Sequence, residues 1–80
     1  MIKLELYYKS TCPFSRKVLN FIEENNIKDK IVFKDIDLNE YDRETLEKVG
    51  GKVQVPCLFI DGKPMYESDE IINFLKENTL

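Results

Sequence analysis

Apolar and polar residues alternate at the start of the chain. Leu4 and Leu6 follow Ile2 at a spacing of two residues, and two tyrosines come directly after them. In an extended chain this spacing places every second side chain on the same face. The pattern therefore predicts a β-strand over residues 3–8.

The spacing becomes helical after residues 10–12. Pro13 suits the first turn of a helix, where its missing N–H leaves no hydrogen bond unmade, and this puts Cys12 at the N-cap. The helix is expected to end at Asn25-Asn26, and we expect Phe14 to pack in the core rather than to form a wall beside the thiol. The predicted apolar face has the spacing i, i+4, i+7 and i+8 and consists of Phe14, Val18, Phe21 and Ile22.

The middle of the chain predicts a second strand and a second helix. β-Branched and aromatic residues are frequent over residues 31–37, which is typical of a strand. A helix is predicted over residues 41–49, with Leu46 and Val49 facing inward and Gly50-Gly51 as its stop.

The last third of the chain predicts a hairpin and a third helix. A strand over residues 53–60 is interrupted near its start by Pro56, and the tight-turn dipeptide Asp61-Gly62 returns the chain as a strand over residues 63–66. Ser68 is expected to cap the last helix, with acidic residues in the first turn. The apolar side of this helix consists of Ile71, Ile72, Phe74 and Leu75.

The predicted order of elements is β-α-β-α-β-β-α. The first two strands should be parallel and joined by a right-handed crossover, and the last two should form a hairpin. We therefore expect an α/β fold, a four-stranded mixed sheet flanked by three helices, in one domain over residues 1–80.

Composition narrows the classes of function. With 12 basic and 15 acidic residues the net charge is −3, and no dense basic face for nucleic acid is visible. No apolar run approaches the roughly 20 residues that span a bilayer, and no charged-then-apolar leader opens the chain. We expect a cytoplasmic monomer that binds neither nucleic acid nor membrane.

Two cysteines and no histidines limit the chemistry. A structural zinc site is not expected because it usually needs four Cys, His or carboxylate ligands, and a Cys–His catalytic pair is impossible. A disulfide between Cys12 and Cys57 stays open, but it is not favoured in a leaderless cytosolic chain. Cys57 lies in a hydrophobic strand, so we expect a small packed hydrophobe.

Three sequence motifs stand out, namely Tyr7-Tyr8-Lys9 with Cys12-Pro13, Gln54-Val55-Pro56, and the Asp61-Gly62 hairpin. Together with the order of elements, these motifs resemble those of a glutaredoxin, a family with the thioredoxin fold. The resemblance covers essentially the whole chain and implies that Pro56 is a cis-proline facing a catalytic cysteine. The segment Tyr66-Glu67-Ser68 is more similar to the glutathione-transferase N-terminal domain.

Cys12 is the predicted catalytic residue. A helix N-terminus with nearby cations lowers a thiol pKa from about 8.5 to roughly 3.5–7.5, and Lys9 and Arg16 are the predicted cations. Lowering the pKa to about 6 gives only a ~2–3-fold faster attack, because nucleophilicity falls with pKa. Most of the catalysis must therefore come from aligning the partner disulfide.

Ser15 decides between two mechanisms. Many glutaredoxins carry a second cysteine at this position, and a serine cannot form a disulfide. The resemblance then implies a monothiol route, in which Cys12 takes the glutathionyl group from a mixed disulfide and a second glutathione releases it. A replaced cysteine at position 15 is also compatible with the sequence.

The resemblance also implies a cradle for glutathione as co-substrate, with no tightly bound cofactor and no metal. The Val55 backbone would pair with the extended peptide, and Lys9 and Gln54 would bind the glycyl carboxylate. Ser68 and Asp69 would meet the γ-glutamyl end at the N-terminus of the last helix, or would serve only as helix caps. The complete set is Lys9, Pro13, Phe14, Gln54, Val55, Pro56, Glu67, Ser68 and Asp69.

Three functions follow from this reading. The first is a glutathione-dependent thiol–disulfide oxidoreductase acting on glutathionylated proteins or small disulfides, with roles in electron transport and cell redox homeostasis. The second is a carrier of a glutathione-ligated iron–sulfur cluster, against which Pro13 argues because such glutaredoxins typically have glycine there. The third is a glutathione-binding domain with little turnover.

Overall fold

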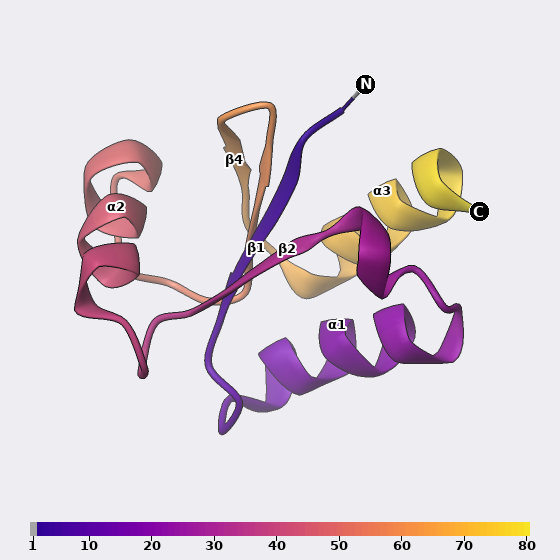
Figure 1. The fold of residues 1–80 in the computed structure, drawn as a ribbon, viewed down its shortest axis with the longest axis horizontal. Helices are drawn as coiled ribbons and strands as arrows, with labels where there is room; N and C mark the ends of the chain where they lie inside the picture. The colour runs from indigo at the N-terminus through magenta and orange to yellow at the C-terminus, as the bar shows by residue number, and fades with distance from the viewer. Residues whose placement is uncertain (1) are drawn as a thin grey trace.

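The computed structural model describes residues 2–80, and its four strands form one mixed sheet (Figure 1). The strand order is β2-β1-β3-β4, with β1 parallel to β2, and β3 antiparallel to both β1 and β4. The predicted mixed sheet and terminal hairpin are confirmed. The strands are β1 (Leu4–Tyr8), β2 (Val32–Asp35), β3 (Cys57–Ile60) and β4 (Lys63–Met65).

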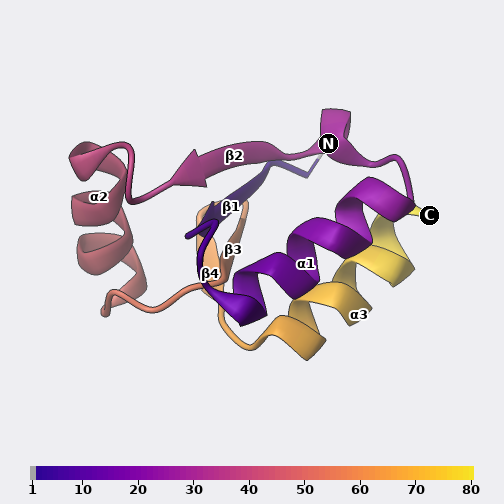
Figure 2. The ribbon, with the colours of Figure 1, turned by 90° about the horizontal axis from the view of Figure 1, so that it is seen from below.

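Three α-helices cover the two faces of the sheet unequally. Helices α1 and α3 lie side by side against one face, while α2 alone covers the other (Figure 2). A short 3-10 helix over Lys28–Lys30, which the sequence analysis did not predict, precedes β2. The α-helices are α1 (Pro13–Glu24), α2 (Glu40–Gly50) and α3 (Ser68–Thr79).

The alternation along the strands divides the core into two clusters, one on each face of the sheet. Leu4 and Leu6 of β1 pack with residues of α1 and α3, whereas Tyr7 packs on the other face with Leu46 of α2. The fully buried side chains of the cluster between the sheet, α1 and α3 are Leu6, Val18, Ile22, Leu58, Ile71 and Leu75.

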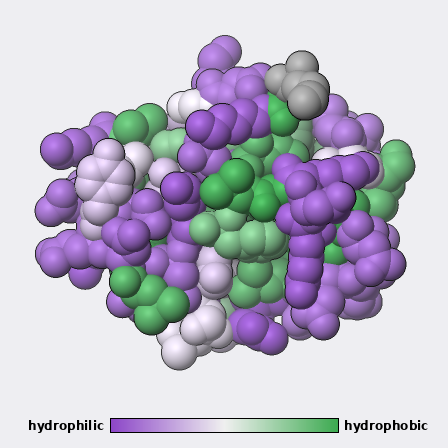
Figure 3. Space-filling view, in the orientation of Figure 1, coloured by the Kyte–Doolittle hydropathy of each residue, from purple (hydrophilic) through white to green (hydrophobic). Residues whose placement is uncertain are grey.

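Strand β2 forms one edge of the sheet. Figure 3 shows a mainly polar face with apolar side chains gathered near its centre, where β2 runs in Figure 1. Val32 of β2 is 47% exposed. In the described residues, 2–80, every helix is too short or too polar to cross a bilayer.

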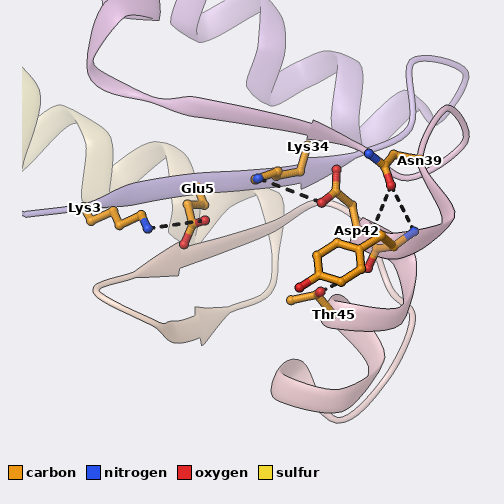
Figure 4. A network of polar contacts seen from close by, with 7 residues as sticks. Lys3, Glu5, Lys34, Asn39, Asp42 and Thr45 are labelled. Carbon is orange, nitrogen blue, oxygen red and sulfur yellow. Dashed lines mark hydrogen bonds and ion pairs between the residues drawn. The ribbon is translucent and has the colours of Figure 1, made fainter.

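The start of α2 is fixed by a side-chain cap and an ion pair (Figure 4). The Asn39 side chain accepts hydrogen bonds from the backbone N–H groups of Tyr41 and Asp42, at 3.0 and 3.3 Å. Lys34 of β2 lies 3.9 Å from the Asp42 carboxylate. These contacts attach the helix to the end of the strand that precedes it.

Three predictions about individual side chains were wrong. Phe14 is 64% exposed rather than packed in the core, and Val49 is 52% exposed rather than inward-facing. Ser68 is the first residue of α3 and not its N-cap, which is Glu67 without a side-chain hydrogen bond. Phe14 lies in the first turn of α1 and Val49 in the last turn of α2, at helix ends that no neighbouring element covers.

Several element ends also differ from the predictions. The strand predicted over residues 31–37 is shorter at both ends, and the strand predicted from residue 53 begins only at Cys57. The Val55-Pro56 peptide bond is cis, as the resemblance implied. Because proline has no N–H to donate to a strand pairing, the chain joins the sheet only after Pro56. Helix α2 is longer by one residue at each end.

Candidate functional site

Cys12 lies in the connection between the end of β1 and the start of α1. It is the N-cap of α1, as predicted, and the next residue, Pro13, is the first of the helix. The Cys12 N–H donates to the Lys9 carbonyl at 3.1 Å, and the Cys12 carbonyl accepts from Arg16 at 2.9 Å. The thiol is half-buried, so a disulfide in solution can reach it.

The surroundings of the sulfur lower the pKa of the Cys12 thiol. Burial works against this by raising the pKa, but the N–H and hydroxyl of Ser15, the N–H of Phe14 and the charge of Lys9 together lower it by more. The side chain makes no strict capping hydrogen bond. These N–H groups therefore act as oriented dipoles at the helix N-terminus.

Ser15 has a position that the sequence analysis missed. Its side chain is fully buried, and its Oγ accepts a hydrogen bond from the Lys9 N–H at 3.3 Å. The hydroxyl proton remains available for the Cys12 sulfur, which agrees with its lowering effect on the pKa of that thiol. The sequence did contain a signal for this position. Ser15 follows the N-cap by three residues, and a side chain at this spacing can interact with the cap.

A cavity of about 220 Å³ borders the N-terminal ends of α1 and α3 and the start of β3. Seven of the nine predicted glutathione-binding residues line it, which brings together three segments that are distant in the sequence. The eighth lining residue, Lys17, was not predicted. The predicted lining residues are Phe14, Gln54, Val55, Pro56, Glu67, Ser68 and Asp69.

Lys17 and Asp69 close one side of the cavity. The Lys17 Nζ forms an ion pair with the Asp69 carboxylate, which joins α1 to α3. Lys17 follows Phe14 by three positions, so both lie on the same face of α1. This spacing was the signal that would have identified Lys17.

The cavity also contains a residue with an unusual backbone conformation. Glu67 has a φ of 75°, in the left-handed region that favours glycine. Strained backbone of this kind tends to occur at functional sites. Ser68, which follows it, is buried at the start of α3, where backbone N–H groups lack intrahelical partners.

The other predicted residues do not line this cavity. Lys9 and Pro13 flank Cys12 along the chain and do not line the cavity. Arg16 is not among the main groups that set the pKa of the Cys12 thiol. It lines a larger cavity of about 380 Å³ with residues of α1, β1 and β2, and this cavity contains none of the predicted site residues.

Cys57 differs from Cys12 in its burial and in the direction of its pKa shift. It is fully buried in the cluster that packs against α2, and burial raises the pKa of its thiol to about 11. Both cysteines are free thiols. The prediction that Cys57 is a small packed residue is confirmed.

Within residues 2–80 no group of three or more His, Cys, Asp or Glu side chains is arranged to hold a metal ion. The polar atoms at the site are instead a single activated thiol, backbone groups around Pro56 and the open end of a helix. This arrangement suits an extended peptide with a sulfur atom and carboxylates.

Comparisons with known proteins agree with the fold. Glutaredoxin 1 of Rickettsia prowazekii is 28% identical over 79 residues, which cover 94% of this chain and 79% of that protein. Glutathione transferase Omega 3C from Trametes versicolor superposes with a TM-score of 0.77 at 28% identity, covering 94% of this chain. The chain spans only 33% of the length of that transferase.

A third similarity supports the fold alone. The holo form of glutaredoxin C1 from Populus tremula x tremuloides superposes with a TM-score of 0.67 at 18% identity, over 94% of this chain and 75% of that protein. The fold and the single activated thiol together define a glutaredoxin-like protein with the thioredoxin fold.

The family itself is given by a match to the model of the glutathione S-transferase N-terminal domain over residues 11–78. The chain belongs to this family. The matched segment begins directly before Cys12 and includes every residue that lines the cavity.

Proposed function

We propose that the protein is a glutathione-dependent thiol–disulfide oxidoreductase that works through Cys12 alone. The observation that carries the proposal is the contrast between the two thiols. The Cys12 thiol is half-buried and its pKa is lowered, whereas Cys57 is buried with a pKa raised to about 11. A protein with one reactive thiol is suited to exchange of a single sulfur substituent.

The reaction has two balanced steps. The Cys12 thiolate attacks the glutathione sulfur of a mixed disulfide, so a bond from Cys12 to glutathione forms and the substrate leaves as its thiolate. A second glutathione thiolate then attacks the glutathione sulfur on Cys12, which releases glutathione disulfide and restores the Cys12 thiolate. Glutathione is the reductant, and the substrate is a glutathionylated protein or a small mixed disulfide.

The lowered pKa assists the second step in particular. In this step Cys12 is the leaving group, and a thiol with a lower pKa leaves faster. The attack step gains less, because a less basic thiolate is also a weaker nucleophile. We therefore assign the larger part of the rate enhancement to alignment of the disulfide by the cavity.

The residues that line the cavity have proposed roles in this alignment. The backbone of Val55 pairs with the extended glutathione, and Gln54 and Lys9 receive the glycyl carboxylate. The N-terminus of α3 at Ser68 receives the γ-glutamyl carboxylate. Lys17 adds a cation for the γ-glutamyl carboxylate at this end. Its ion pair with Asp69 supports this role, because the γ-glutamyl group carries a carboxylate and an ammonium. Each partner of the ion pair would then meet an opposite charge on the ligand.

The experiment is a glutathione-coupled reduction of the mixed disulfide of cysteine and glutathione. We expect the unmodified protein and Cys57→Ala to be active and Cys12→Ser to fall to the background rate. Activity of Cys12→Ser would contradict the proposal. Loss of activity in a folded Cys57→Ala variant would contradict the one-thiol mechanism and favour an intramolecular disulfide.

The family match favours a second candidate, a glutathione-binding domain with little turnover. The same assay separates the two functions. The second candidate predicts binding of glutathione together with a rate that does not exceed the background. Turnover that depends on Cys12 would exclude it.

A further inference from the structure

Tyr66 is linked to both walls of the cavity at the N-terminal ends of α1 and α3. The first wall consists of Gln54, Val55 and Pro56, and the second consists of Glu67, Ser68 and Asp69. Tyr66 directly precedes the second wall along the chain. Its hydroxyl reaches the segment that precedes the first wall.

The Tyr66 hydroxyl donates to backbone carbonyls at the end of α2. It lies 3.1 Å from the Gly50 oxygen and 3.0 Å from the Lys52 oxygen. The last carbonyls of a helix have no partner within the helix, so they need an external donor. The hydroxyl supplies one and thereby joins α2 and the loop after it to the end of β4, which lies beside α2 in Figure 1.

Two further contacts connect Tyr66 to residues on either side of the first wall. The Lys52 ammonium lies 4.7 Å from the centroid of the Tyr66 ring, at a distance typical of a cation–π contact. The hydroxyl also interacts with the thiol of Cys57, which directly follows Pro56. The first wall therefore has a contact with Tyr66 on each side, at Lys52 before it and at Cys57 after it.

The Tyr66 hydroxyl occupies the space that a side chain at position 50 would need. The Gly50 backbone belongs to α2, so its conformation does not demand glycine. A Cβ at this position would overlap the Tyr66 hydroxyl, and it would lie 3.4 Å from Leu46 Cδ1. A side chain at position 50 would therefore displace the Tyr66 hydroxyl.

From these contacts we infer that Tyr66 is a positioning residue for glutathione, which sets the spacing between the two walls of the cavity. Tyr66 itself does not line the cavity, so it acts through the residues of both walls. The inference rests on the proposed function, because it takes glutathione as the ligand.

The first test is the affinity for glutathione of Tyr66→Phe, measured by titration calorimetry in a Cys12→Ser background that cannot react. Loss of one hydroxyl with its two backbone partners should raise the Kd roughly 2- to 10-fold. Tyr41→Phe is the matched control, because the Tyr41 side chain is 74% exposed. It should leave the Kd unchanged.

The second test uses Gly50→Ala. Alone, this variant should weaken binding because its Cβ displaces the Tyr66 hydroxyl. In the double variant Gly50→Ala/Tyr66→Phe the overlap is removed, so binding should be no weaker than in Tyr66→Phe. Hydrogen exchange of the amides at positions 52–55 should be faster in Tyr66→Phe than in Tyr41→Phe, which reports on the wall independently of ligand.

The outcomes separate this inference from the proposed function. If the parent protein binds glutathione and Tyr66→Phe binds it equally well, the positioning role is wrong and the proposed function stands. Additive losses in the double variant would likewise contradict the role. If the parent protein does not bind glutathione, the proposed function fails and the inference fails with it.

Discussion

The buried hydroxyl of Ser15 influences the Cys12 sulfur, although serine takes no part in disulfide exchange. It accepts the Lys9 N–H at 3.3 Å, and its presence lowers the pKa of the Cys12 thiol. From the sequence, Ser15 signified only that a second thiol was missing. The structure adds an electrostatic role, which the sequence could not reveal because it depends on the burial of this side chain.

Replacement of Ser15 by alanine should raise the pKa of Cys12. The variant removes one of the groups that favour the thiolate, while the burial that favours the thiol remains. The measurement is the rate of alkylation by iodoacetamide as a function of pH. The midpoint should move to higher pH, and the rate at neutral pH should fall.

Ser10→Ala is the control for this prediction. Ser10 is exposed in the same loop, so its removal should leave the alkylation profile unchanged. An unchanged midpoint in Ser15→Ala, or equal shifts in both variants, would show that the Ser15 hydroxyl does not act on the thiol.

Among the elements, α2 depends most on its own end contacts, because it covers one face of the sheet alone (Figure 2). Asn39 satisfies two of the first N–H groups of the helix. Asn39→Ala should lower the free energy of unfolding by about 1 kcal/mol, within the range of roughly 0.5–2 kcal/mol for lost N-caps.

Urea unfolding measures this effect. Asn39→Asp should retain most of the stability because aspartate is an equally good N-cap. Asn73→Ala is the matched control, since Asn73 is exposed in the interior of α3 and alanine favours a helix. A cost for Asn39→Ala no greater than that for Asn73→Ala would argue against the cap.

The type and order of the elements could be predicted from the sequence, because hydrophobic periodicity depends on local spacing. Their ends were less predictable, since these depend on contacts with other elements. Val49 continues the apolar spacing of α2 but lies beyond the part of the helix that faces the sheet. The cap of α3 was misplaced by one residue because Glu67 takes a conformation unusual for glutamate.

In the whole molecule, the sheet separates the two thiols. Cys57 packs in the cluster that faces α2, whereas Cys12 begins α1, which covers the opposite face (Figure 2). The candidate site combines three distant segments at one edge of the sheet. Residues with a motif were predictable, and the spacing of Lys17 from Phe14 places it on the same helix face. The ion pair of Lys17 and the backbone contacts of Tyr66 were not predictable, because they depend on other elements.

Burial of ionisable groups should make the whole protein less stable at alkaline pH. Burial, as the main cause, raises the pKa of Cys57 from 9.0 to about 11, and those of Tyr7 and Tyr66 from 10.0 to about 12. Raised values give stability that is complete below the ordinary values and is lost as the pH rises toward the folded values. Cys12, with its lowered pKa, has the opposite effect.

The free energy of urea unfolding at about pH 8 and about pH 10.5 measures this loss. It should be smaller at the higher pH. Cys57→Ala should show a smaller decrease between the two values, since it removes one of the groups with a raised pKa, and Ser10→Ala should show the same decrease as the parent protein. Equal stability at both values would contradict the assigned burial of these groups.

Intact-mass measurement after treatment with the mixed disulfide of cysteine and glutathione tests the central claim, the single reactive thiol, most directly. The parent protein and Cys57→Ala should each gain one glutathionyl group, which excess glutathione should then remove. Cys12→Ser should gain none. A glutathionyl group on Cys12→Ser, or a parent protein that instead loses two hydrogens by joining Cys12 to Cys57, would contradict the one-thiol mechanism.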